Sequence, residues 1–341
     1  MKPTFISAVL LLAIAIPGLS AQEPRLLSGN GAVPAENAAE GPEVLLFPLY
    51  PLIHSAEAGT VFWNPDWPLS MPPDAFDSAK KAVSGIILNT GDAVLACRWD
   101  GKGRLREFPV YLGGAFFQAR TQRGGNDLLT EIFLTGPETI TAELLEYRDG
   151  LPVLARITRG GGNYFVSFHH WLNGVSETWY DAQGNAAGLL SADYAKINRR
   201  SLAVMVQYIA GNEKSVISYS YDSWGNVSGI TGAGIAVSAL YNQFGRPRYV
   251  ERHWDAVSPG DVPYFAGTVS GAAGNYSFQW DESGLLRTVR GAFDGNTAEL
   301  RYEYTLDSER NWTERRELRM VRQGGYLFPQ PGPVLTRTLE Y

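Results

Sequence analysis

Apolar and polar residues alternate along much of the chain with a period of two. Leu300, Tyr302 and Tyr304 share one face of an extended segment, and Glu299, Arg301 and Glu303 share the other. Successive side chains of a strand point to opposite faces, so this alternation predicts half-buried antiparallel strands. The strands predicted in this way span 84–88, 93–99, 128–134, 140–147, 164–171, 202–208, 215–221, 274–280 and 300–304.

One segment has the features of a helix. Asp74 follows two prolines and can cap a helix N-terminus, and Lys80 and Lys81 suit its C-terminal end. We predict a short helix over 74–82, within an irregular cover over 44–82 that packs on the first strands. Pieces rich in glycine and proline at 120–126, 159–163, 255–263 and 324–333 are predicted loops. Because no long helical period appears, the predicted fold class is all-β: an extended antiparallel meander of repeated hairpins that forms a curved or coiled sheet.

A short phrase recurs between the predicted strands. It reads aromatic residue, Asp or Asn, two free residues, then Gly, and clear copies begin at Trp99, Tyr180, Tyr221, Tyr241 and Trp280. The carboxylate can accept the backbone N–H two residues on, and the glycine supplies the positive φ of a tight turn. The residues predicted to form these turns are Asp100, Gly103, Asp181, Gly184, Asp222, Gly225, Gly245, Asp281 and Gly284. A degenerate copy, with Leu in place of the aromatic residue and Arg in place of the glycine, begins at Leu306, and a shortened copy begins at Tyr147.

This phrase resembles the core of the YD-repeat (RHS-type) family, in which Tyr-Asp-x-x-Gly is followed by Arg or Asn. The resemblance covers roughly 95–341, with uneven spacing between copies. It implies a β-hairpin spiral, which in the family forms shells around toxin cargo or belongs to extracellular proteins implicated in carbohydrate binding. The chain is short for a closed shell and lacks the Asp-Pro-x-Gly autoproteolysis motif, so we expect the architecture to carry over without toxin delivery.

The N-terminus has the pattern of an export signal. Lys2 precedes an uncharged apolar stretch, and small residues suited to cleavage follow it. We predict a signal peptide over 1–21, a disordered linker over 22–43 and a single β-rich domain over 44–341. The apolar stretch is short of the roughly 20 residues of a membrane span, so we expect no stable span once the leader is removed. With one cysteine, Cys97, the chain forms no intramolecular disulfide, and we expect a bacterial protein exported to the periplasm or the outside.

Charge and motif content disfavour several classes of partner and of active site. A formal charge of −6 disfavours nucleic acid as a partner. His169 and His170 are neighbours on a predicted strand and point to opposite faces, so we expect no metal site there and no cofactor. The repeated aspartates recur with the structural unit, which favours a role in turns over general acid–base catalysis.

These observations favour an exported, non-enzymatic β-repeat protein with a scaffold or binding role at the bacterial envelope. Its expected partner is an envelope or extracellular glycan, or another envelope protein. The candidate binding residues are Trp224, Phe244 and Trp312, because exposed aromatic rings can stack on sugar faces. Two alternatives stay open. One is a secreted hydrolase with its site on loops, and the other is an outer-membrane β-barrel, which the alternating residues near Tyr341 suggest and Arg337 in the same register opposes.

Overall fold

The computed structural model describes one compact unit within Val44–Tyr341. The described residues are 49–61, 74–76, 83–91, 93–112, 115–172, 174–185, 190–197, 200–210, 213–232, 235–254, 274–293 and 296–341. The predicted signal peptide, the predicted linker and the predicted loop at 255–263 lie outside them. Among the described residues, no helix is long and apolar enough to cross a membrane.

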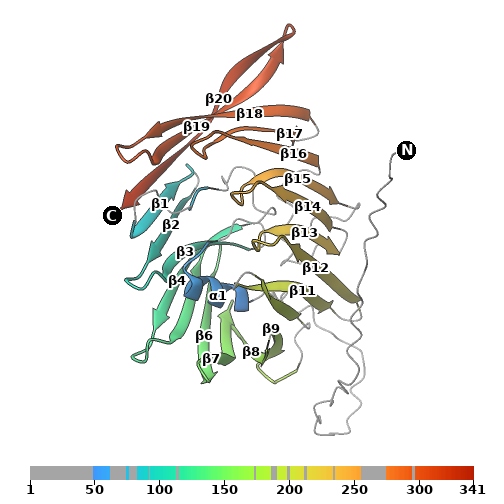
Figure 1. The fold of residues 1–341 in the computed structure, drawn as a ribbon. Helices are drawn as coiled ribbons and strands as arrows, with labels where there is room; N and C mark the ends of the chain where they lie inside the picture. Colours follow the sequence, from blue (N-terminus) through green and yellow to red (C-terminus); the bar gives the residue numbers. More distant parts are fainter. Residues whose placement is uncertain are drawn as a thin grey trace, which may run out of the picture. The chain divides into compact units, whose positions relative to one another are not determined.

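One helix and twenty strands make up the described part of the chain (Figure 1). In order they are α1 (Tyr50–Ala58), β1 (Gly85–Asn89), β2 (Val94–Trp99), β3 (Leu105–Leu112), β4 (Ala115–Arg123), β5 (Leu129–Thr135), β6 (Thr139–Arg148), β7 (Leu151–Arg159), β8 (Gly162–Trp171), β9 (Gly174–Asp181), β10 (Leu190–Ile197), β11 (Arg200–Ala210), β12 (Glu213–Tyr221), β13 (Val227–Gly232), β14 (Ile235–Tyr241), β15 (Pro247–Trp254), β16 (Gly274–Trp280), β17 (Leu286–Phe293), β18 (Asn296–Leu306), β19 (Trp312–Gln323) and β20 (Tyr326–Glu340).

The strands form an antiparallel meander that closes into a β-barrel. Each strand pairs with its neighbours in sequence, and β1 also pairs with β20, from Gly85 opposite Glu340 to Asn89 opposite Thr336. The prediction of an all-β antiparallel meander with one short N-terminal helix is therefore confirmed. The sheet is closed, whereas the sequence left open whether it closes, coils or splits.

An ionic ladder crosses the seam where the last strand meets the first. Glu340, Gly85, Arg98, Glu107 and Arg120 lie opposite one another on five consecutive strands, β20, β1, β2, β3 and β4. Arg98 binds Glu107 on one side and reaches Glu340 on the other, with Nη2 2.8 Å from Oε1. Arg98 can pass over β1 because Gly85 has no side chain: a Cβ there would lie 2.2 Å from Glu340 Oε2.

The two faces of the barrel wall differ in polarity. Buried residues such as Ile86, Leu88, Phe108 and Ile132 recur at alternate positions and form the core cluster of the first half of the chain. Ion pairs between neighbouring strands, such as Glu143 with Arg156, lie at the intervening positions and stay partly exposed. The period of two in the sequence thus separates an apolar inner face from a charged outer face.

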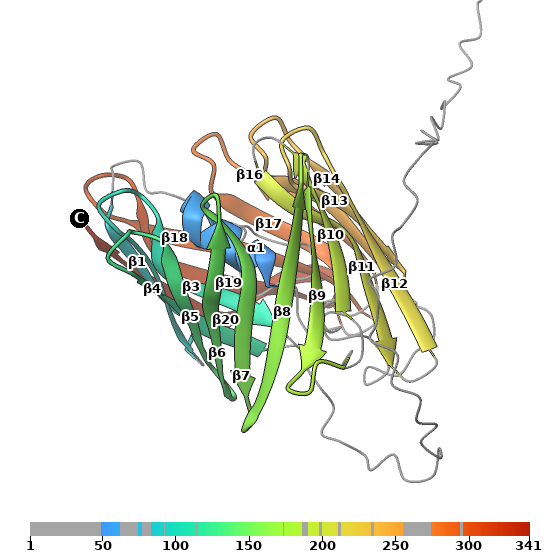
Figure 2. The same cartoon turned by 90° about the horizontal axis from the view of Figure 1, so that it is seen from below.

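The helix lies at a different place from the one predicted. Asp74–Phe76 form a turn, and the remainder of the predicted helix over 74–82 lies outside the described residues. The helix that forms, α1, follows Leu49, carries Pro51 in its first turn and ends at Gly59, whose φ of 70° is left-handed. Figure 2 shows α1 enclosed by the ring of strands. Its buried residues Tyr50, Leu52, Ile53 and Ala56 belong to the core of the barrel, so this segment is an internal filling instead of an outer cover.

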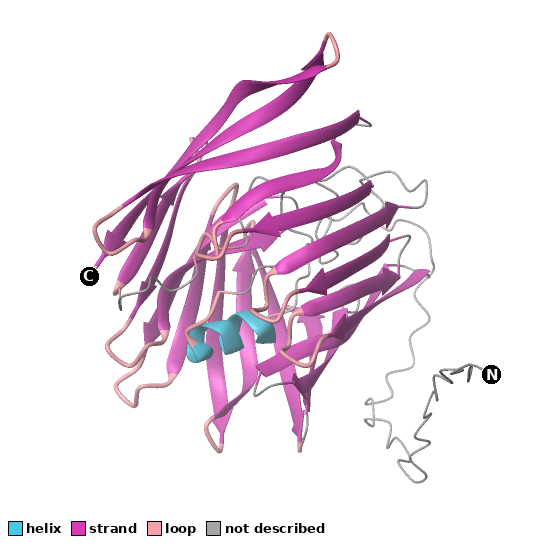
Figure 3. Ribbon diagram, turned by 45° about the horizontal axis from the view of Figure 1, so that its top comes forward, coloured by secondary structure: helices cyan, strands magenta, loops and turns pink. Residues whose placement is uncertain are grey.

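The predicted loop at 324–333 is also wrong in part. Residues 326–333 belong to β20, and 326–331 pair with β19 around the two-glycine turn at Gly324 and Gly325. Figure 3 draws both arms of this hairpin as strands. The prolines of this stretch sit on a strand with one unpaired edge, where a missing N–H costs no ladder hydrogen bond. The predicted loops at 120–126 and 159–163 contain tight turns, but their outer residues extend the adjoining strands.

Candidate binding surface

Six tight turns share one geometry. They run from Asp100, Asp181, Asp222, Asn242, Asp281 and Asp307 to the residue four positions later. In each turn the side-chain Oδ1 of the first residue accepts the backbone N–H of the fifth, at 2.7 to 3.0 Å. The fourth residue has positive φ and is glycine in five of the six turns. In the turn that begins at Asp307, Arg310 takes the place of the glycine, with a φ of 64°.

Hydrogen bonding lowers the pKa of three of the turn aspartates. Burial raises the pKa of Asp100, Asp281 and Asp307, but the backbone N–H groups and side chains that bind each of them outweigh it and lower the pKa overall. The hydrogen bonds thus favour the ionised form of Asp100, Asp281 and Asp307.

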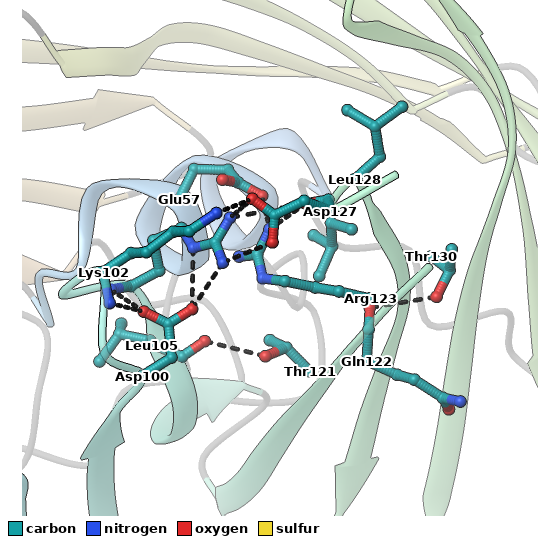
Figure 4. Close-up of polar contacts among 12 residues, drawn as sticks. Glu57, Asp100, Lys102, Leu105, Thr121, Gln122, Arg123, Asp127, Leu128 and Thr130 are labelled. Atoms are coloured by element: carbon teal, nitrogen blue, oxygen red, sulfur yellow. Dashed lines mark hydrogen bonds and ion pairs between the residues drawn. The ribbon is translucent and has the colours of Figure 1, made fainter. Parts of the chain in front are cut away.

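Additional ion pairs hold the first turn. Figure 4 shows Lys102 of this turn beside Asp127 of the next turn on the same rim. Arg104 binds the same carboxylate, with Nη2 2.9 Å from Oδ1. Arg104 also binds Asp100 of its own turn, with Nη2 2.7 Å from Oδ2. Beside this cluster, Arg123 of β4 binds Glu57 of α1, which ties the helix to the barrel wall.

Five of the six turns lie on one rim. In an antiparallel meander, connections that follow even-numbered strands all reach the same end of the barrel. The turns after β2, β12, β14, β16 and β18 therefore share a rim, and the turn after β9 lies at the other end. Three consecutive turns touch: a Cβ at Gly245 would lie 3.5 Å from Asn226 Nδ2, and one at Gly284 would lie 2.2 Å from Arg246 Nη2.

The third position of each turn points outward and has no part in the turn geometry beyond its backbone N–H. It is occupied by Lys102, Gln183, Trp224, Phe244, Ser283 and Glu309. Four of these residues are polar, whereas Trp224 and Phe244 are 59% and 70% exposed. The two aromatic residues occupy consecutive turns of one rim, about 10 Å apart as set by two strand spacings.

A groove opens beside Phe244. It has a volume of about 460 Å³ and is lined by Tyr241, Asn242, Gln243, Phe244, Arg248, Phe278 and Trp280. The Arg246 guanidinium lies 5.8 Å from the Phe244 ring centre and 5.5 Å from that of Trp280, and so holds the two rings beside it. Trp280 Nε1 donates to the Pro247 carbonyl at 2.8 Å, and Tyr241 Oη donates to the Val227 carbonyl at 2.8 Å. The aromatic walls are thus fixed by hydrogen bonds before any ligand arrives.

The third candidate binding residue has a different environment. Trp312 is 2% exposed and faces the interior, where the Arg337 guanidinium lies 4.1 Å from its ring centre. Its burial removes it from any stacking surface on the rim. Sequence reasoning identified Phe244 but missed Tyr241, Trp280 and Arg248, although Tyr241 and Trp280 stand at the aromatic position of the repeated phrase.

Of the carboxylates in the described part of the chain, Glu177 and Asp74 are buried. Glu177 of β9 accepts the backbone N–H groups of Leu49 and Tyr50 at the start of α1, at 2.9 to 3.0 Å. Burial raises the pKa of Glu177 to about 7 against the lowering effect of these hydrogen bonds. Burial also raises the pKa of Asp74, while Arg315 and Arg337 act to lower it. Glu177 thus holds the start of α1, and neither carboxylate belongs to the groove lining.

Three further side chains of types that can act in catalysis, Cys97, His170 and His253, lie on β2, β8 and β15. Cys97 is buried, and burial raises its thiol pKa, so the thiolate that a nucleophile requires is disfavoured. His170 Nε2 lies against the Pro152 carbonyl, and His253 Nε2 lies 2.7 Å from Glu251 Oε1. No group of three metal-ligating side chains occurs among the described residues.

Comparisons with known proteins identify distant structural neighbours. No family model matches the sequence, and no curated protein sequence matches it. A porin-like protein from Bacteroides uniformis is 11% identical over 76% of this chain and 96% of its own, with a TM-score of 0.34. A porin-like protein from Bacteroides vulgatus is 12% identical over 76% of this chain and 99% of its own, with a TM-score of 0.21. TcdB2–TccC3 is 12% identical over 66% of this chain and 15% of its own, with a TM-score of 0.23. These likenesses concern the β-architecture and are too distant to bear on function. The chain is a closed twenty-stranded antiparallel β-barrel with a helix in its core.

Proposed function

We propose that the protein is an exported, non-enzymatic binding barrel that takes a glycan in the groove beside Phe244. The observation that carries this proposal is the groove itself, in which Phe244, Trp280 and Tyr241 lie beside Asn242, Gln243 and Arg248. Aromatic rings stack on the apolar faces of sugars, while amides and guanidinium groups bind their hydroxyl or carboxylate groups. Trp224 on the neighbouring turn extends the same rim, at a distance that an extended oligosaccharide can bridge.

The turn geometry does not require an aromatic residue at the third position. Four other turns use Lys102, Gln183, Ser283 or Glu309 at the same position with the same backbone geometry. An exposed large apolar side chain gains little for stability at such a site and marks a contact surface when several cluster. This internal comparison supports a binding role for Trp224 and Phe244.

Binding fits the groove better than catalysis does. Among the described residues, its lining contains no carboxylate, histidine or cysteine. A glycosidase needs two carboxyl groups across the scissile bond, and a nucleophilic hydrolase needs an activated nucleophile with a base. The groove therefore supports recognition, and the secreted hydrolase remains the less favoured alternative.

The outer-membrane alternative agrees with the closed barrel but not with the outer wall. Outward-facing residues include the cross-strand pairs of Arg98 with Glu107 and Arg290 with Glu299. An arginine facing lipid at the bilayer midplane costs about 2–4 kcal/mol, and most apolar side chains of this barrel lie on its inner face. We therefore favour a barrel whose wall faces water at the bacterial envelope.

A glycan array probed with the purified protein tests the proposal. We expect binding to a subset of glycans, with affinity reduced on the order of tenfold in Phe244→Ala and in Trp224→Ala through loss of stacking. Gln183→Ala is the matched control, because it alters the equivalent turn position on the opposite rim and should leave binding unchanged. Binding that persists in the Phe244→Ala protein, or that is lost equally in the control, would place the site elsewhere. Turnover of any bound glycan would favour the hydrolase.

A further inference from the structure

The hairpin of β19 and β20 extends beyond its neighbours in the sheet. β18 pairs with β19 only as far as Met320, and β1 pairs with β20 only from Thr336 onward. Figures 1 and 3 show the hairpin projecting past the ends of the adjacent strands. The connection follows β19, so its tip lies on the rim opposite Trp224 and Phe244.

The tip exposes apolar side chains on both faces. Tyr326, Leu327 and Phe328 are consecutive, and they are 75%, 44% and 49% exposed. Neighbouring residues of a strand point to opposite faces, so Leu327 lies on one face and the two aromatic residues on the other. A protein partner that packs on one face would leave the other in water, whereas the interface of a lipid bilayer surrounds both.

The free edge of the hairpin is unsuited to pairing with another strand. Pro329 and Pro331 lie opposite Met320 and Leu318 of β19 within a continuous ladder. A proline has no N–H, so it is tolerated where that group would point away from the ladder, toward the free edge. An added strand would find donors missing at alternate positions, which disfavours a second copy or a peptide as the occupant.

The charge of the tip differs from that of the whole chain. Between 318 and 333 there are two arginines, Arg319 and Arg322, and no acidic residue, while the chain carries a formal charge of −6. Both arginines are exposed. Aromatic and aliphatic residues flanked by arginines match an anionic lipid surface, where the rings enter the headgroup region and the guanidinium groups bind phosphate.

We propose that the β19–β20 hairpin docks the barrel onto an anionic phospholipid surface. The tip inserts Tyr326, Leu327 and Phe328 to the level of the headgroups, and Arg319 and Arg322 bind lipid phosphates beside them. The barrel wall stays in water. The aromatic rim at the other end of the barrel then faces away from the membrane, so this proposal does not depend on the ligand of that rim.

Co-sedimentation with vesicles tests the docking. We expect the purified protein to bind vesicles that contain phosphatidylglycerol and to bind vesicles of phosphatidylcholine alone weakly. Replacing Tyr326, Leu327 and Phe328 together by serine should reduce partitioning roughly tenfold or more. Arg319→Gln and Arg322→Gln should each reduce it about fivefold, with reduced sensitivity to salt. Trp224→Ala is the control on the other rim and should bind vesicles as the unmodified protein does.

A site-specific probe separates insertion from adsorption. Cys97 is buried, so a cysteine introduced by Leu327→Cys can be labelled selectively with an environment-sensitive fluorophore. A blue shift on anionic vesicles supports insertion of the tip. Equal vesicle binding by the triple-serine protein, or no binding by the unmodified protein, would overturn the proposal. So would a self-association that the triple-serine substitution abolishes in the absence of vesicle binding, because the occupant would then be a second copy.

Discussion

Two sectors of the barrel interior are lined in different ways. Strands β1 to β10, here the helix sector, present an almost wholly apolar inner face that belongs to the same core cluster as α1. Strands β15 to β20, here the arginine sector, bury Arg252, Arg315 and Arg337 among aromatic rings. The guanidinium groups lie 5.6, 4.4 and 4.1 Å from the ring centres of Tyr276, Tyr302 and Trp312, respectively.

The two sectors fill the wide interior of the barrel in different ways. A twenty-stranded barrel is wider than the small barrels that ordinary inward side chains fill, so its interior takes an additional segment or unusually long side chains. In the helix sector the filling is α1, whose first backbone N–H groups are satisfied by Glu177. In the arginine sector long cationic side chains extend inward, stacked on rings, with Asp74 among their neighbours. Among the described residues, few polar groups are buried in the helix sector, whereas three buried arginines line the arginine sector.

The largest expected effect comes from removing the anchor of the helix sector. Glu177→Ala leaves the N–H groups of Leu49 and Tyr50 without their acceptor and opens a cavity, so we expect a loss of about 3 kcal/mol or more in the free energy of unfolding. Urea unfolding measures it. The pH profile gives a second signature, because burial raises the pKa of Glu177 from 4.5 to about 7.

The sign of that pH dependence follows from the raised pKa. The unfolded chain loses the Glu177 proton near pH 4.5, while the folded protein retains it up to about pH 7. Stability is therefore highest below the lower value and falls as the pH rises to the higher one, by on the order of 3 kcal/mol. Glu177→Gln should remove this contribution, whereas Glu303→Gln, at an exposed position, should leave it intact. An unchanged pH profile in Glu177→Gln would contradict the assignment.

A smaller effect is expected in the arginine sector. Arg337 Nε donates to the buried Trp312 carbonyl at 2.9 Å, and its guanidinium stacks on the Trp312 ring. Arg337→Ala removes both contacts and should cost about 2–3 kcal/mol in urea unfolding. Arg337→Lys keeps the charge without the planar stack and should fall between. The half-exposed Arg301 offers the matched control, since Arg301→Ala should cost about 0.5 kcal/mol; equal costs at 301 and 337 would remove the distinction between inner and outer arginines.

The smallest effect concerns the seam that joins the sectors. Gly85→Ala places a Cβ where Glu340 meets Arg98, and it should cost about 1 kcal/mol by displacing that partly exposed ion pair. A double-mutant cycle with Glu340→Gln separates this cause from general strain, because both changes remove the same contact and their effects should not add. Additive costs would show that Gly85 serves another purpose.

Much of the local structure could be predicted from the sequence. The alternation at 215–221 and 300–304 marks strands because it arises within one segment, and Asp222 with Gly225 marks a turn because their interactions span four residues. Phe244 was a candidate binding residue for the same local reason, since a turn needs no aromatic residue at its third position. The remainder of the groove was missed because Trp280 reaches it from another hairpin, 36 positions further along the chain.

Tertiary structure also decided which aromatic residues face outward. Trp224 lies at the tip of a turn, and Trp312 lies just after one. These positions can be read from the sequence, but the exposure of the first residue and the burial of the second cannot. Trp312 begins β19 on its inner face, where Arg337 from the next strand covers it. The alternation along a strand gives it two different faces. The curvature of the sheet decides which of these faces lies inside the barrel.

By itself, the sequence determined the all-β class, the antiparallel hairpins and the geometry of their turns, because these depend on contacts between residues a few positions apart. Only the tertiary structure decided that β20 returns to β1, that α1 fills the core, and that 326–333 extends a strand. These features rest on pairings such as Ser84 with Glu340, separated by 256 positions, and on twist accumulated over twenty strands. No local sequence pattern specifies these distant pairings or the accumulated twist. Closure and filling of the barrel are therefore decided only when the whole sheet assembles.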